Sequence, residues 1–65
     1  MNKKDAIETF KAGSSVIYNG IEYPYISAII YRRGLCGIYA RLELMDRNGR
    51  DVVIVDPKRV TEMEP

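Results

Sequence analysis

The sequence of 65 residues contains no histidine and only one cysteine, Cys36. Without histidine, the chain lacks the commonest general base and the commonest metal ligand of proteins. A single cysteine allows no disulfide within the chain and no cluster of Cys and His that would bind structural zinc. We interpret Cys36 as a small residue in a tight turn, because no base is present to activate it as a nucleophile. We therefore expect no catalytic residue, no metal and no cofactor, and we expect that the protein is not an enzyme.

Long apolar runs are also lacking. Asp5 and Glu8 come before any apolar run long enough for a signal peptide or a membrane span. We therefore predict a cytoplasmic protein without a membrane partner. The apolar fraction of 46% is typical of a globular chain, and its length gives room for a single domain, which we expect to cover residues 1–65.

Charge is nearly balanced overall but unevenly distributed. The net charge of +1 gives no overall field that would draw the molecule onto a phosphate backbone. From residue 32 to residue 50, however, five arginines stand against two acidic residues, whereas acidic residues outnumber basic ones beyond residue 50. The middle of the chain is therefore basic and its C-terminal part acidic.

The first residues predict a short amphipathic helix over residues 3–12. Asn2 has the position and spacing of a capping-box residue, and Gly13 supplies a left-handed stop. Ile7 and Phe10 fall on one helical face. Because so short a helix is not stable alone in water, we expect these two side chains to lie on an apolar surface.

After the helix the apolar period changes to two, which is typical of strands. Asn19 and Gly20 lie between two apolar runs and predict a type I′ hairpin turn, since both of its central positions need positive φ. This turn places Val16 opposite Tyr23. Pro24 has no backbone N–H, so we expect the strand to bend or bulge there or to lie at an edge, before a new strand begins.

The clearest alternation in the chain is in the segment of residues 38–45. Its even-numbered residues are apolar and its odd-numbered residues are mostly polar, which indicates a strand with one buried face and one solvated face. We therefore predict that four side chains point into the core: Ile38, Ala40, Leu42 and Leu44.

The partner of this strand, residues 52–55, is apolar on both faces, so only the intervening turn fixes its register. A two-residue turn at residues 48–49 would place Leu44 opposite Val53. A type I turn at residues 46–49, followed by a glycine bulge, would place Leu44 opposite Val52. We favour the second arrangement, because an aspartate at the first position of a turn can hydrogen-bond within it.

The end of the chain predicts a tight turn led by Pro57 and a short strand near Val60. The sum is one helix and about five strands with short connections. We therefore expect a mainly β protein, a small β-barrel over residues 15–62 with one short N-terminal helix.

The segments GSSVIYNGIEY (13–23) and LELMDRNGRDVVIVDPKRV (42–60) have turn and strand spacings that resemble those of small SH3-like barrels, including the Tudor and KOW types. The resemblance covers residues 13–61 and implies a five-stranded barrel with a short helical turn before the last strand. It carries over no functional residue, because neither an aromatic cage of the Tudor type nor the KOW glycine and basic pattern is found. Short proteins of this kind with an added helix are frequent among bacterial phage and mobile-element accessory genes, which suggests such a source by analogy.

Function then depends on the outer surface. Tyr, Arg and Met are enriched at protein interfaces, and the apolar excess at residues 52–55 leaves surface to cover, so we expect a non-catalytic interaction or adaptor module that binds a protein partner or a second copy of itself. The alternative is a nucleic-acid-binding domain, in which tyrosines stack on bases and arginines neutralise phosphates. The candidate binding residues are Tyr25, Tyr31, Arg32, Arg33, Tyr39, Arg41 and Met45.

Overall fold

The computed structural model describes residues 1–63, so residues 64–65 of the expected domain lie outside the described part. The described chain is mainly β with one α-helix, as predicted, but it contains six strands and not five. The elements are α1 (Lys3–Ala12), β1 (Val16–Tyr18), β2 (Ile21–Tyr23), β3 (Tyr25–Gly34), β4 (Gly37–Met45), β5 (Val52–Val55), the 3₁₀ turn η1 (Pro57–Arg59) and β6 (Val60–Glu62).

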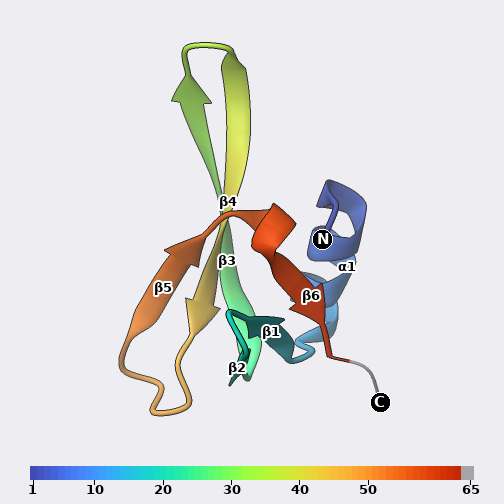
Figure 1. Cartoon of the computed structure of the whole chain (residues 1–65), viewed down its shortest axis with the longest axis vertical. Coiled ribbons are helices and arrows are strands. Elements are labelled where there is room, and N and C mark those ends of the chain that lie inside the picture. Colours follow the sequence, from blue (N-terminus) through green and yellow to red (C-terminus); the bar gives the residue numbers. More distant parts are fainter. Residues whose placement is uncertain (64–65) are drawn as a thin grey trace.

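The strands form two antiparallel three-stranded sheets, in the orders β2-β1-β6 and β3-β4-β5 (Figure 1). Only Pro24 separates β2 from β3. Because proline cannot donate to a strand ladder, the pairing breaks there and the chain passes from one sheet to the other. The predicted bend at Pro24 is confirmed, and it splits what would otherwise be one long strand into two.

The helix α1 has the predicted limits and the predicted caps. The Oδ1 atom of Asn2 accepts a hydrogen bond of 2.8 Å from the backbone N–H of Asp5, which satisfies one of the free donors of the first turn. Gly13 ends the helix in the left-handed conformation with a φ of 69°. The local sequence signals therefore determine both ends of α1.

The buried side of α1 differs from the predicted one. Ala6 and Thr9 are buried, whereas Phe10 is 39% exposed and Ile7 is only partly buried. The expectation that Ile7 and Phe10 lie on an apolar surface is therefore wrong for Phe10. The helix rests on its small side chains, and a small residue such as Ala6 allows it to approach the sheets closely.

The β1–β2 hairpin has the predicted turn. Asn19 and Gly20 have φ values of 55° and 77°, as a type I′ turn requires. Val16 lies opposite Tyr23, and both are buried. The two sheets and the helix enclose one apolar core of Ala6, Val16, Tyr23, Ile26, Leu42, Leu44, Val55 and Val60.

The β4–β5 hairpin has the register that we did not favour, because Leu44 lies opposite Val53. A type I turn does form at residues 46–49: the N–H of Gly49 donates to the carbonyl of Asp46 at 2.9 Å, and Gly49 has a φ of 67°. The N–H of Asp46, however, donates to the carbonyl of Asp51 at 2.9 Å. The loop therefore holds residues 47–50, one residue more than the bulged turn allows, and this extra residue shifts the register.

The register decides which side chains of β5 reach the core. Val53 packs against the core and Val55 is buried, whereas Val52 and Ile54 are 43% and 49% exposed on the opposite face. The strand β5 is therefore apolar on a face that no described element covers.

The β3–β4 hairpin extends well beyond the rest of the molecule (Figure 1). The strand β5 ends at Val55, which lies opposite Leu42, whereas β3 and β4 stay paired as far as Gly34 and Gly37. At about 3.4 Å per residue, the distance from Leu42 to Gly37 carries the turn about 17 Å past the end of β5. We call residues 30–41 the arm.

The arm corrects the prediction for the inner face of β4. Leu42 and Leu44 are completely buried, as predicted, but Ala40 is only partly buried and Ile38 is 68% exposed. Ile38 does lie on the same face of the ribbon as Leu42. It is not in the core because no other element within residues 1–63 extends far enough to cover it.

Candidate functional site

The sheet β3-β4-β5 has one face on the core and one outer face without a covering element. Directly paired residues of a sheet point to the same side. The residues on the uncovered side belong to five pairs: Tyr25↔Met45, Arg32↔Tyr39, Ile30↔Arg41, Glu43↔Ile54 and Met45↔Val52. We call this surface the outer face. Its apolar and aromatic members are Tyr25, Ile30, Tyr39, Met45, Val52 and Ile54.

The predicted binding residues do not form one surface. Five of them lie on the outer face, whereas Tyr31 and Arg33 point to the opposite side of the arm, where they pair with Ala40 and Ile38. Neighbouring residues of a strand alternate between faces, so Arg32 and Arg33 cannot share one. The five candidates that the structure brings to the outer face are Tyr25, Arg32, Tyr39, Arg41 and Met45.

Tyr39 is held in place by its neighbours on the outer face. The guanidinium carbon of Arg41 lies 4.6 Å from the centroid of the Tyr39 ring, a cation–π contact. The same ring leans over Gly34, where an added Cβ would lie 3.0 Å from its Cε1 atom. The absence of a side chain at Gly34 therefore makes room for the ring, and Tyr39 and Arg41 form an aromatic and cationic pair.

Asp56 connects Arg41 to the body of the protein. Its carboxylate accepts the backbone N–H of Lys58 at 3.0 Å, which caps η1, and lies 3.9 Å from the Arg41 guanidinium. The hydrogen bond from Lys58 and, to a smaller extent, the charge of Arg41 hold the pKa of Asp56 below its ordinary value. At 3.9 Å, with both side chains partly exposed, this ion pair is weak and leaves Arg41 free to bind another anion.

The most exposed apolar residues of the outer face are those that the sequence could not assign. Val52 and Ile54 lie on β5, which is one of the two edge strands of its sheet. Native edge strands are commonly protected by Lys, Pro or inward charges, but β5 consists of four β-branched aliphatic residues. Once the register of the β4–β5 hairpin is known, the alternation of the strand places Val52 and Ile54 on the outer face.

The arm carries a local excess of positive charge. The sequence has no Asp or Glu between Glu22 and Glu43, whereas the arm carries three arginines. On the inner side of the arm, the Nζ atom of Lys3 lies 5.4 Å from the centroid of the Tyr31 ring. Since the whole chain has a net charge of +1 and the arm +3, the rest of the molecule has a net charge of −2. The molecule is therefore electrically asymmetric along its length.

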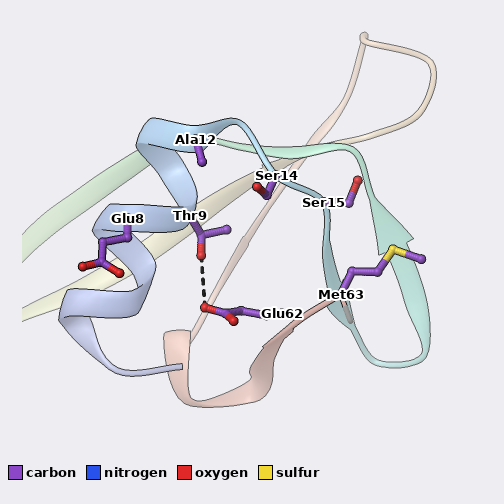
Figure 2. A pocket seen from close by; sticks show the side chains of 7 residues that line it. All are labelled: Glu8, Thr9, Ala12, Ser14, Ser15, Glu62 and Met63. Atoms are coloured by element: carbon purple, nitrogen blue, oxygen red, sulfur yellow. Dashed lines mark hydrogen bonds between the residues drawn. The ribbon is translucent and has the colours of Figure 1, made fainter. Parts of the chain in front are cut away.

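Apart from the outer face, the surface has a recess between the C-terminal half of α1 and β6 (Figure 2). It is shallow, with a volume of about 260 Å³, and Thr9 bridges its two walls by donating to Glu62 at 3.4 Å. The hydroxyl of Ser15, which also lines it, donates to the carbonyl of Pro24 at 3.3 Å. These polar groups hold the helix and the strand ends together and form no arrangement of a nucleophile with a base.

Two further properties hold for residues 1–63. No three residues of the types His, Cys, Asp and Glu lie close enough together to bind a metal ion. No helix in this range combines the length and the apolar character needed to cross a membrane.

Comparison with known proteins gives no match to a family model, a curated protein or a solved structure.

Proposed function

We propose that the chain is a small SH3-like barrel. Support comes from the position where the chain passes from one sheet to the other at Pro24. If β2 and β3 are counted as one strand that bends at Pro24, the number of strands is five. The pairing of β6 with β1 and the 3₁₀ turn directly before β6 also agree with this proposal. The two sheets of the described chain would then be the two halves of one strongly bent sheet.

We further propose that the protein is a non-catalytic interaction module that binds a protein partner through the outer face. The observation that supports this most strongly is the exposure of Val52 and Ile54 on an unprotected edge strand, next to Met45 and Tyr39. Exposed apolar surface beside aromatic and arginine side chains is typical of protein interfaces, and a free edge can pair with a strand of a partner or of a second copy.

A photo-crosslinking amino acid in place of Ile54 tests this proposal in cells that produce the protein. We expect covalent adducts with a protein, either another protein or a second copy of the chain. Ile21 is the matched control, because it is an isoleucine of similar exposure, 54%, on a strand of the other sheet. Adducts at neither position, or equally at both, would contradict the proposal.

A nucleic-acid partner is the second candidate. The observation that favours it is the cluster of Arg32, Tyr39 and Arg41 on the outer side of a ribbon without acidic residues, since such side chains neutralise phosphates and stack on bases. Binding of this kind would be strongly weakened by salt. A gel shift with single- and double-stranded oligonucleotides at low salt tests it, and no shift at tens of micromolar protein would exclude this partner.

A further inference from the structure

The turn at the end of the arm exposes apolar side chains that neither the core nor the outer face uses. Leu35 is fully exposed, Cys36 is exposed and Ile38 is 68% exposed. The turn lies at one extreme end of the molecule, away from every other element (Figure 1). We call residues 34–38 the tip. A packing role within this chain does not explain these apolar side chains.

The order of side chains along the arm is the second observation. The ladder runs from the turn through the pairs Arg33↔Ile38, Arg32↔Tyr39 and Tyr31↔Ala40. The outermost residues are therefore Leu35 and Cys36 of the turn. Behind them, Ile38 and Arg33 share the first pair with exposed side chains, and Arg32 with the half-exposed tyrosines follows. No carboxylate lies anywhere in the arm.

We propose that the tip inserts shallowly into the surface of an anionic lipid bilayer, in contrast to the expectation from the sequence that the protein has no membrane partner. This proposal is independent of the protein-binding function, because it uses the tip and the arginines behind it and not β5. In a bilayer the charged headgroups lie outside and the acyl chains inside, so an approaching arm buries its most distal residues deepest. Leu35 would then reach the boundary of the acyl chains, with Ile38, the tyrosines and the arginines at the level of the headgroups.

The same order argues against a nucleic acid as the partner of the tip. The phosphates of a nucleic acid are its outermost groups, so a ribbon that binds them is expected to present its cations first. Here Leu35 extends beyond Arg32 and Arg33. The asymmetry of charge also orients the molecule, because the arm carries +3 and the remainder −2, and an anionic surface therefore attracts the end that carries the tip.

The backbone limits the depth of insertion. Beyond the end of β5, both edges of the two-stranded arm are unpaired, and unpaired backbone groups are very unfavourable inside hydrocarbon. The tightly turned tip has few such groups. Insertion of the tip alone, with the rest of the arm among hydrated headgroups, is therefore the arrangement that the geometry allows.

Cys36 is the only cysteine in the chain and lies at the tip, so it provides a selective attachment point for an environment-sensitive fluorophore. The labelled protein is mixed with vesicles of equal parts phosphatidylcholine and phosphatidylglycerol, and separately with vesicles of phosphatidylcholine alone. We expect a blue shift of the emission and co-sedimentation only with the anionic vesicles, both weakened by added salt.

Variants of the unlabelled chain separate insertion from attraction of charge. Leu35→Asn, which leaves the charge of the arm unchanged, should abolish co-sedimentation without loss of folding, since Leu35 makes no contact in the core. Arg32→Gln and Arg33→Gln should each weaken it about fivefold. Ile21→Asn is the matched control, a similar change at an exposed position of the other sheet, and should leave binding unchanged.

Three results would overturn the proposal. The first is no co-sedimentation with anionic vesicles at tens of micromolar protein. The second is unchanged binding of Leu35→Asn, which would mean attraction of charge without insertion. The third is tighter binding to an oligonucleotide than to the vesicles. The crosslinking experiment at Ile54 does not depend on any of these results. It therefore tests the protein-binding proposal separately.

Discussion

The two halves of the β3–β4 hairpin share one alternating pattern along β4 but have opposite environments. In the half next to β5, Leu42 and Leu44 are fully buried between the sheets, whereas in the arm Ile38 continues the same face of the same strand and is largely exposed. The difference arises because α1 and the other sheet, which cover Leu42 and Leu44, do not extend over Ile38. An alternating pattern thus determines the face to which a side chain points, and the extent of the elements packed on that face determines whether it is covered.

The largest effect is expected in the buried half. Leu44→Ala should lower the free energy of unfolding by about 2–5 kcal/mol, because it removes a fully buried side chain and leaves a cavity in a small core. Urea denaturation followed by circular dichroism measures this change. A loss below about 1 kcal/mol would mean that the core does not depend on this half of the hairpin.

A smaller effect is expected where the helix joins the body. Asn2→Ala should destabilise the protein by about 1 kcal/mol, since the N–H of Asp5 loses its acceptor at the start of α1. The same denaturation experiment applies, with Asn2→Asp as the control that keeps an acceptor. Equal stabilities of the two variants would contradict the capping role.

Low pH tests the connection between the arm and η1. The folded pKa of Asp56 lies below its unfolded value, so its ionised form stabilises the fold above the unfolded value of about 3.9, and this contribution is lost as the pH falls through the folded pKa. In acid titrations of stability, the wild type should therefore lose more stability below about pH 4 than Asp56→Asn. Parallel curves for the two proteins would contradict this role of Asp56.

Within the arm, a substitution at Gly34 should change local geometry more than stability. An added methyl group would lie 3.0 Å from the exposed ring of Tyr39, which can turn away. We expect Gly34→Ala to shift the NMR signals of Tyr39 and Arg41 while the free energy of unfolding changes by less than about 0.5 kcal/mol. Unchanged signals would mean that the ring does not lie over Gly34.

The smallest effect is expected at the exposed end of the alternating pattern. Ile38→Ser should change the free energy of unfolding by no more than about 0.5 kcal/mol, because the side chain is already in solvent. The comparison with Leu44→Ala is the sharpest stability test of the difference between the two halves. A loss of several kcal/mol at Ile38 would place it in the core.

Local signals predicted the local structure well. The caps at Asn2 and Gly13, the type I′ turn at residues 19–20 and the bend at Pro24 each depend on the chemistry of a few adjacent residues, and each is confirmed. The inward orientation of Leu42 and Leu44 was also predictable, because it follows from alternation along one strand.

The remaining features depend on contacts between distant segments. The register of the β4–β5 hairpin changes when the loop is one residue longer or shorter, and the loop sequence is compatible with both candidate turns. The separation of Arg32 from Arg33 follows from the pleat, but the full extent of the outer face required that register. Neither the exposure of Phe10 nor that of Ile38 was readable from the sequence, since each depends on where another element ends.

Solvent access to methyl groups tests the central difference most directly. With a soluble paramagnetic probe in dilute solution, the methyl NMR signals of Leu35 and Ile38 should broaden strongly, whereas those of Leu42 and Leu44 should stay sharp. Equal protection of Ile38 and Leu42 under these conditions would show that the alternating strand is buried along its whole length and that the arm does not stand free of the body.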